Sequence, residues 1–333
     1  MSNSSFTFSI NSESDQPKFR QIIDAVIDAI AEKRLNQGDR LPSVNYVCQT
    51  YKLSRDTVFK AYAILKEQGI IQSVPNKGYF VSNETRKVFV FLDTFKAYKE
   101  VLYHSFIDNL DKNIIADVHF HHYNIELFSK LLNESFGKYS KYIIMPFDHP
   151  EMANQLKKIA NDKLLIIDWE LFSNKDNNIL YQDFNLAFQN SLKAALPEFS
   201  KYKKVVFVYP EFTYHPQESV DAFQKFCQKN DLNHSVMTHS SDFKLEPKTA
   251  YISVSDRILG RFLEMCNQNN LEPGKDVGFL SYNETPMKKF IYKGISVIST
   301  DFGLMGKRAA DFASSDQQIR EEVPTSYIKR ASL

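Results

Sequence analysis

The sequence is poor in the features that mark secreted and membrane-spanning proteins. Its three cysteines, Cys48, Cys227 and Cys266, lie far apart without C-x-x-C spacing, so we expect buried thiols and neither disulfides nor a zinc site. The apolar runs, such as 205–209, fall far short of the roughly 20 residues that span a bilayer. The N-terminal segment lacks the basic and apolar regions of a signal peptide, which predicts a cytoplasmic protein without a membrane partner.

The motifs of several enzyme classes are also absent. We find no G-x-G-x-x-G or P-loop phosphate cradle, no G-x-S-x-G nucleophile elbow and no H-E-x-x-H zinc pair. The sequence therefore predicts no catalytic residues and no cofactor, and an enzyme is the disfavoured alternative. His119, His121 and His122 alternate along one predicted strand, with no carboxylate at a fixed spacing. We therefore expect core or surface histidines and no metal site.

Charge is unevenly distributed along the chain. Residues 17–82 hold ten Lys and Arg against six Asp and Glu, whereas residues 83–333 hold 31 against 32. A basic surplus at one end favours contact with nucleic acid, because neutralising phosphates supplies much of the affinity of DNA-binding proteins. A surplus of four is modest support when taken alone.

Residues 17–82 show the pattern of a helix-turn-helix followed by a hairpin. Apolar residues recur at helical spacing over 19–30, Ser43 precedes a short helical stretch, and Ser54 precedes another that ends at Gly69. Two short helices joined by a tight turn are typical of DNA-binding proteins. Residues 70–81 then predict two strands around a Pro-Asn-Lys-Gly turn, because Gly78 can adopt positive φ.

The second of these helices presents polar side chains near its start. Arg55 and Thr57 lie off the apolar stripe, where a recognition helix contacts base edges, and Lys60 lies one turn further on. Lys77 at the hairpin tip is placed for a phosphate or a minor-groove edge. These residues predict double-stranded operator DNA as a partner, with a module that binds protein instead as the alternative.

The same segment resembles the winged helix-turn-helix of the GntR family of bacterial regulators. The resemblance rests on the Leu-Pro-Ser entry at 41–43, Ser-Arg-x-Thr-Val at 54–58, the terminating glycine and the Lys-Gly-x-Phe-Val wing at 77–81. It implies these DNA-contacting positions: Arg40, Ser43, Ser54, Arg55, Thr57, Lys77 and Gly78. Asn45 and Phe59 stand where many members have arginine, so the operator preference cannot be transferred from the family.

The remaining residues predict a separate α/β domain. Residues 1–16 are expected to be a flexible N-terminus and 83–86 a polar linker, and apolar strand-like runs then alternate with helical stretches over 87–333. Such alternation is typical of βαβ units and mostly parallel sheets. We interpret the pattern as two similar α/β lobes in tandem, with a cleft that closes on a ligand.

Candidate ligand-binding residues follow the predicted strands, because ligands of open α/β sheets bind at the carboxyl ends of strands. Carboxylates, amides and aromatic rings together suit a polyhydroxylated molecule. The candidates are Asp93, Tyr98, Phe147, Asp148, His149, Asp168, Trp169, Glu170, Asp183, Tyr214, His215, Ser255, Asp256, Arg257, Asn283 and Glu284. Trp169 can equally cap the core, and Asp168 or Asp183 can cap helices.

Residues 253–313 resemble the second lobe of LacI-type sensor domains, which share the type I periplasmic binding protein fold. The matching features are Ser-Asp at 255–256, the strand that ends in Tyr-Asn-Glu at 282–284, and Thr-Asp-Phe-x-x-Met-Gly at 300–306. On that pattern Ser255 or Asp256, and Asn283, would bind sugar. The pattern's usual arginine and aspartate are replaced by Ser219 and Asn283, so the ligand's identity stays open.

Taken together, the two resemblances imply an AraR-like regulator whose effector is a monosaccharide such as a pentose or deoxyhexose. A purine or an amino acid is the alternative effector. We expect a homodimer, because helix-turn-helix proteins commonly read paired half-sites with two-fold symmetry. Repression relieved by ligand is the sign that the families favour, and activation is the alternative.

Overall fold

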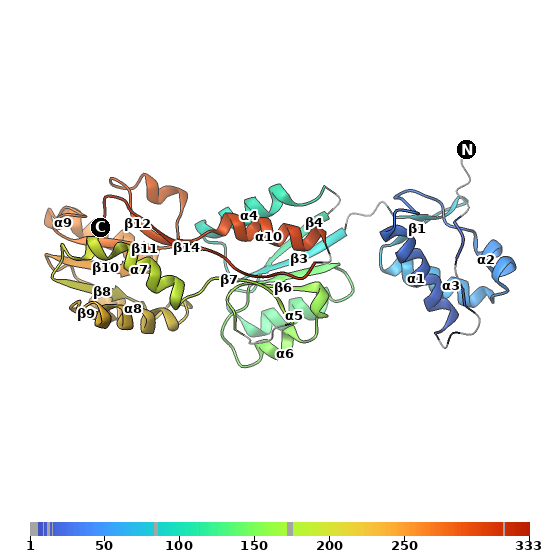
Figure 1. The fold of residues 1–333 in the computed structure, drawn as a ribbon, viewed down its shortest axis with the longest axis horizontal. Helices are drawn as coiled ribbons and strands as arrows, with labels where there is room; N and C mark the ends of the chain where they lie inside the picture. The colour runs from blue at the N-terminus through green and yellow to red at the C-terminus, as the bar shows by residue number, and fades with distance from the viewer. Residues whose placement is uncertain are drawn as a thin grey trace. The chain divides into compact units, whose positions relative to one another are not determined.

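The computed structural model describes residues 6–8, 10, 11, 14, 16–82, 86–112, 114–171, 176–315 and 317–333. Contacts divide the chain into two compact units. The first comprises residues 1–87 with the short segments 113–115 and 136–140, and the second comprises the rest (Figure 1). Residues 83–85, which make up most of the predicted linker, lie outside the described residues.

The N-terminal unit contains the predicted helix-turn-helix and hairpin. Its helices are α1 (Lys18–Ala31), α2 (Val44–Tyr51) and α3 (Arg55–Glu67), and strands β1 (Ile71–Val74) and β2 (Gly78–Val81) pair antiparallel. The Ser43 side chain accepts a hydrogen bond from the Tyr46 N–H at the start of α2. Ser54 does the same for Thr57 at the start of α3. Both predicted helix caps are confirmed.

One apolar core joins the three helices and the hairpin. Val26, Val47, Val58 and Tyr62 are among its fully buried members. Phe6 and Phe8 also pack into this core, and the Phe8 N–H donates to the Tyr51 hydroxyl over 2.8 Å. Burying two aromatic rings stabilises these two residues against the helices.

The second unit consists of two α/β lobes. The sheet of lobe 1 has the order β4-β3-β5-β6-β7-β13, and α4 (Ala97–Asn109), α5 (Ile125–Ser135) and α6 (Met152–Leu156) belong to this lobe. Its strands are β3 (Arg86–Leu92), β4 (Ile114–Phe120), β5 (Lys141–Ile144), β6 (Leu164–Asp168), β7 (Asn178–Tyr181) and β13 (Arg320–Glu322). The pairs β3–β5, β5–β6, β6–β7 and β7–β13 are parallel.

The sheet of lobe 2 has the order β9-β8-β10-β11-β12-β14, and only β14 runs antiparallel to its neighbour. Its strands are β8 (Lys204–Val208), β9 (His234–Met237), β10 (Thr249–Ser253), β11 (Gly278–Tyr282), β12 (Ser296–Thr300) and β14 (Thr325–Ile328). Helices α7 (Leu186–Phe199) and α8 (Glu218–Lys229) cover one face, and α9 (Asp256–Asn269) packs on β10 and β11.

The lobes do not follow one another in simple tandem, and this part of the prediction is wrong. After β12 in lobe 2 the chain returns to lobe 1, where α10 (Phe302–Ser314) packs along α4 and β13 joins the edge of the sheet (Figure 1). The chain then crosses again to form β14. A Cβ atom on Gly306 would lie 2.3 Å from the Leu102 carbonyl oxygen, so glycine permits the close contact between α10 and α4.

Candidate DNA interface and ligand pocket

The start of α3 presents the residues predicted to contact DNA. The Ser54 and Thr57 hydroxyl oxygens lie 2.7 Å apart and share a hydrogen bond, which fixes both side chains at the helix N-terminus. Arg55 is exposed beside them, with its guanidinium 5.5 Å from the centre of the Phe59 ring. Lys60 is exposed too, and its ammonium lies 4.2 Å from the Phe19 ring. A cation and two hydroxyls thus occupy the end of α3 that can approach a base pair.

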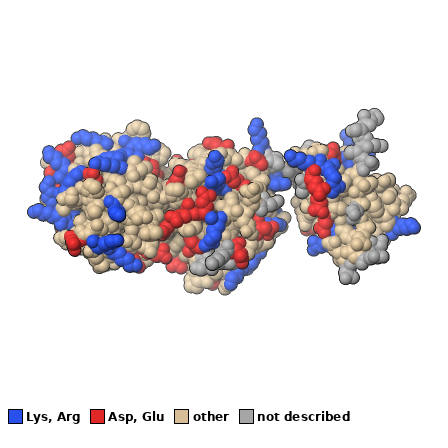
Figure 2. Space-filling model, viewed as in Figure 1, with Lys and Arg blue, Asp and Glu red and all other residues tan. Residues whose placement is uncertain are grey.

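Arg40 lies beside the hairpin, and Lys77 lies in its turn. The Arg40 guanidinium lies along Gly78, where a Cβ atom would be 3.5 Å from two of its nitrogen atoms. Gly78 has φ +107°, so its backbone conformation favours glycine. Lys77 is exposed in the turn between β1 and β2. On the face shown in Figure 2, acidic and basic side chains are mixed over this unit, so charge alone does not outline a DNA-binding surface there.

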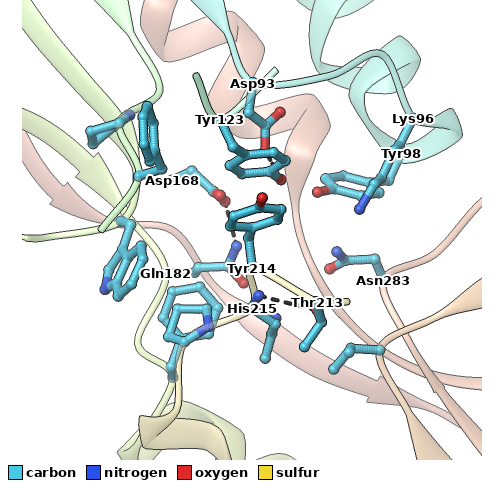
Figure 3. Close-up of a pocket in the computed structure, with 16 residues that line it drawn as sticks. Asp93, Lys96, Tyr98, Tyr123, Asp168, Gln182, Thr213, Tyr214, His215 and Asn283 are labelled. Atoms are coloured by element: carbon cyan, nitrogen blue, oxygen red, sulfur yellow. Dashed lines mark hydrogen bonds between the residues drawn. The ribbon is translucent and has the colours of Figure 1, made fainter. Parts of the chain in front are cut away.

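The second unit has a pocket at the carboxyl ends of its strands, where the two lobes meet (Figure 3). Lobe 1 and lobe 2 both contribute to its lining. The lining residues are Asp93, Lys96, Tyr98, Tyr123, Pro146, Phe147, Asp168, Trp169, Gln182, Phe184, Thr213, Tyr214, His215, Pro216, Val254 and Asn283. This is the place at which open α/β sheets bind ligands.

Two tyrosines meet face to face across the pocket. The Tyr123 ring of lobe 1 and the Tyr214 ring of lobe 2 are 3.7 Å apart between centres and inclined by 5°. The Tyr123 hydroxyl donates to the Asp93 carboxylate, which fixes its ring, whereas Tyr214 is 59% exposed. The stack joins the two lobes through apolar faces and places flat surfaces inside the pocket.

The pocket holds two carboxylates in different environments. Asp93 is buried and forms an ion pair with Lys99, whose side chain is completely buried. Asp168 accepts a hydrogen bond from the Gln182 amide, and burial raises the pKa of its carboxyl group. An acid that is partly withdrawn from water and bonded to a neutral amide can accept hydrogen bonds from ligand hydroxyls or amines.

Two buried polar atoms of lining residues lack a hydrogen-bond partner within the described part of the chain. They are Nε2 of His215 and Oδ1 of Asn283. Burial lowers the pKa of His215 to about 3, so its imidazole is neutral at physiological pH. Unsatisfied buried polar atoms are costly, and a ligand with hydroxyl groups would satisfy both of these.

Comparison with known proteins identifies the first domain. Residues 18–81 match the model of the bacterial regulatory proteins, gntR family. These residues form a GntR-type DNA-binding domain. The uncharacterized regulator YydK of Bacillus subtilis is 31% identical over 85 residues, which cover 26% of this chain and 36% of YydK. The mannosyl-D-glycerate transport/metabolism system repressor MngR of Escherichia coli is 31% identical over 103 residues, covering 31% of this chain.

The chain spans 36% and 42% of the lengths of YydK and MngR. The two-lobed domain instead resembles LacI-type regulators in fold. The trehalose repressor of E. coli has a TM-score of 0.61 and 10% identity, covering 74% of this chain and all of that structure. A LacI family regulator from Lactobacillus casei with bound sucrose has a TM-score of 0.63 and 13% identity, covering 75% of this chain and all of that structure.

The structure places half of the residues predicted for ligand binding in the pocket. Those that line it are Asp93, Tyr98, Phe147, Trp169, Tyr214, His215 and Asn283, together with Asp168. The remaining candidates lie outside the lining, although each follows a strand or a connecting loop as predicted. They are Asp148, His149, Glu170, Asp183, Ser255, Asp256, Arg257 and Glu284.

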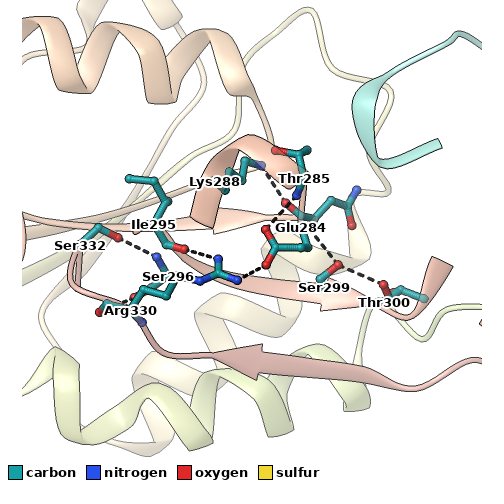
Figure 4. Close-up of polar contacts among 10 residues, drawn as sticks. Glu284, Thr285, Lys288, Ile295, Ser296, Ser299, Thr300, Arg330 and Ser332 are labelled. Carbon is teal, nitrogen blue, oxygen red and sulfur yellow. Dashed lines mark hydrogen bonds and ion pairs between the residues drawn. The ribbon is translucent and has the colours of Figure 1, made fainter. Parts of the chain in front are cut away.

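Most of these outlying residues have local partners that account for them. Asp183 caps α7 by accepting from the Leu186 N–H over 3.0 Å, and Glu170 pairs with Arg320. Two further outlying carboxylates form ion pairs: Asp256 lies 2.8 Å from the Lys288 ammonium, and Glu284 pairs with Arg330 (Figure 4). Arg257 lies over the Phe212 ring, His149 accepts from the Glu151 N–H, and Asp148 is exposed.

Sequence reasoning missed several lining residues. Lys96 and Tyr123 follow strands that were predicted, so counting a few residues further along each loop would have found them. Gln182 and Phe184 follow β7, which was not predicted as a strand. Thr213 adjoins the predicted Tyr214, and its hydroxyl accepts from the His215 N–H over 3.1 Å. The other missed residues are Pro146, Pro216 and Val254.

His121 is hydrogen-bonded to the pocket residue Tyr123, and we expect it to make the stability of the protein depend on pH. It is fully buried, its Nδ1 accepts from the Tyr123 N–H, and its Nε2 donates to the Met145 carbonyl. Burial lowers its pKa to about 4, against 6.5 for an unperturbed histidine. Between pH 6.5 and about 4, the unfolded chain binds a proton at His121 that the native state does not bind, so the free energy of unfolding falls by about 1.4 kcal/mol per pH unit at most.

Denaturant unfolding followed by Trp169 fluorescence at pH 7.0, 6.0 and 5.0 measures this dependence. The H121Q variant cannot titrate at residue 121 and is expected to lose less stability than the wild type between pH 7 and 5. Equal slopes for the two proteins would show that another group is responsible.

Proposed function

We propose that this protein is a ligand-responsive transcriptional regulator, in which the GntR-type domain binds operator DNA and the two-lobed domain binds a small-molecule effector. Support for DNA binding comes from Arg55, Thr57 and Lys60 at the exposed start of α3 and from Arg40 beside the hairpin. In a helix-turn-helix, this end of the recognition helix enters the major groove.

The proposed effector is an uncharged monosaccharide, with a pentose or a deoxyhexose as the first choice. The observation that carries this choice is the combination of the stacked Tyr123 and Tyr214 rings with the unpartnered atoms of His215 and Asn283 and the carboxylate of Asp168. Ring faces pack against the apolar side of a sugar, and the polar atoms bind its hydroxyls.

The stacked tyrosines also favour a second candidate effector. Two parallel rings that separate by one layer would accept a planar purine base between them. Nucleosides and amino acids are therefore tested as effectors beside the sugars.

Regulation follows from the two-lobed design. A ligand that contacts both lobes stabilises one angle between them, and it changes DNA affinity only as far as it prefers that conformation. We propose a homodimer in which the lobe angle sets the spacing of the two DNA-binding domains, with ligand relieving repression. In the described part of the chain, every helix is too short or too polar to cross a membrane.

Fluorescence of the only tryptophan tests the effector class directly. Trp169 lines the pocket, so excitation at a wavelength selective for tryptophan reports on the site itself. The full chain is titrated with pentoses, hexoses, deoxyhexoses, hexose 6-phosphates, nucleosides and amino acids, and hits are repeated as thermal shifts. A ligand at about 100 times its dissociation constant is expected to stabilise the protein by about 2.7 kcal/mol.

A matched variant separates binding in the pocket from binding elsewhere. The N283A protein should lose affinity in both the fluorescence and the thermal-shift readouts if the ligand binds in the pocket, whereas unchanged affinity would place the ligand elsewhere. Hits confined to nucleosides or amino acids would replace the sugar with the alternative class. No change with any arm of the panel would refute a small-molecule effector of these classes.

A further inference from the structure

The three connections between the lobes are hydrogen-bonded to one another. They are the segment after β7, the residue between β12 and α10, and the turn between β13 and β14. The Val323 N–H donates to the Tyr181 carbonyl over 2.7 Å, which joins the third connection to the first. The Asp301 N–H donates to the Pro324 carbonyl over 2.9 Å, which joins the second to the third. Any rotation of one lobe against the other must move all three segments together.

Side-chain hydrogen bonds also join the same three connections, and Gln182 lies at their centre. Its amide oxygen accepts from the Thr300 hydroxyl over 2.9 Å and from the Tyr282 hydroxyl over 3.2 Å. The Thr300 hydroxyl oxygen lies 2.7 Å from that of Thr325. Because Thr300 has one proton and gives it to Gln182, Thr325 donates to Thr300. We call Gln182, Thr300 and Thr325 the hinge cluster, with one member at each connection.

The other end of the Gln182 amide faces the ligand pocket. Its Nε2 donates to the Asp168 carboxylate, and its backbone N–H donates to the Asp168 carbonyl over 3.1 Å (Figure 3). Asp168 has φ +80°, in the left-handed region that residues with side chains rarely adopt, and Gln182 holds it there from both sides. Gln182 is 4% exposed, so water does not compete freely for its bonds.

We propose that Gln182 is the residue that transmits occupation of the pocket to the hinge. A planar amide joins its two ends rigidly, so a change in the bond to Asp168 displaces the oxygen that Thr300 and Tyr282 share. A ligand hydroxyl or amine that binds the Asp168 carboxylate changes that bond and thereby the lobe angle. This inference deepens the proposed function, because it names the route by which a ligand of the same pocket acts, whatever its chemical class.

The route can be tested without a ligand by changing the charge in the pocket. In Q182E, the carboxylate still accepts from Thr300 and Tyr282 but repels Asp168. Adding D168N removes the repulsion and restores a donor to residue 182. Q182M removes both ends of the link and keeps the length of the side chain.

The lobe angle is read as a distance between two spin labels by pulsed electron spin resonance. Labels are attached at the exposed positions of K130C on α5 and K225C on α8, in the full chain carrying C48S, because Cys227 and Cys266 are buried. Q268E and Q268M make the same substitutions at an exposed glutamine of α9, away from the hinge cluster, and serve as matched controls. Circular dichroism confirms that each variant is folded.

We expect Q182E to shift the distance distribution, Q182E/D168N to return it towards the wild type, and both Gln268 variants to leave it unchanged. D168A, which removes the acceptor, should shift the distribution when residue 182 is glutamine and have no effect in Q182M. Wild-type distributions in both Q182E and Q182M would overturn the proposal, and so would an equal effect of D168A with either residue at 182. If Q182E does not fold, the Q182M pair decides. Because no ligand is added, failure here leaves the sugar proposal to its own test.

Discussion

The K99M variant is expected to unfold with a free energy about 3 to 5 kcal/mol below that of the wild type, because it removes one partner of a buried ion pair. Lys99 is completely buried at the start of α4, and its ammonium contacts the Asp93 carboxylate. Methionine fills a similar volume but leaves Asp93 as an uncompensated charge at 5% exposure. Urea unfolding of the full chain, followed by Trp169 fluorescence, measures the loss.

Two further variants show whether the buried charge is the cause. D93N/K99M leaves no charge behind, so it should recover most of the stability that K99M loses. K157M makes the same substitution at an exposed lysine and should cost little. If K99M costs no more than K157M, the ion pair does not stabilise lobe 1. A double variant as unstable as K99M would point to poorer packing instead.

The helices and strands predicted best are those in which the spacing of apolar residues within one segment is enough to identify the element. The helices of the GntR-type domain follow from apolar spacing and from serine caps at Ser43 and Ser54, and the structure places both caps as expected. The strands β3, β5, β6, β8 and β10 are buried apolar runs that a local pattern reveals. Local pattern is a sound guide where one element buries its own apolar face.

The elements missed are those whose identity depends on distant partners. β7 is four residues long, and β13 is a three-residue segment of charged side chains that becomes a strand by pairing with β7. The path of α10 back to lobe 1 has no local signal, because it is decided by packing on α4 about 200 residues earlier in the chain. Chain order alone therefore predicted a tandem arrangement that the crossovers contradict.

The pocket was half predictable for the same reason. Strand ends locate Asp93, Asp168 and Asn283, because the rule for open sheets needs only the strands. The rule cannot say which carboxylates are already bonded to neighbouring protein groups. Asp183 caps α7, and Glu284 forms an ion pair with Arg330. Gln182 was missed because its importance comes from Thr300 and Thr325, which lie more than a hundred residues away.

The R55A variant is expected to bind specific DNA about 1 to 3 kcal/mol more weakly than the wild type, or roughly 5- to 150-fold, if the guanidinium binds a guanine edge. Arg55 is exposed at the start of α3, and its guanidinium lies 5.5 Å from the centre of the Phe59 ring, where it can reach DNA. The DNA is a duplex selected from a random library with the wild-type protein, and affinity is measured by fluorescence anisotropy at several salt concentrations.

The salt series and a matched lysine distinguish base recognition from simple charge. Lys66 is exposed near the other end of α3, so K66A removes the same charge from the same helix and should change affinity little. If Arg55 binds a base, R55A weakens binding to the selected duplex more than to random DNA; if it binds a phosphate, R55A weakens both and lowers the salt slope by about one. Equal affinities for R55A and K66A would show that the start of α3 does not enter the groove, and the proposed interface would then have to centre on Arg40 and Lys77 of the hairpin.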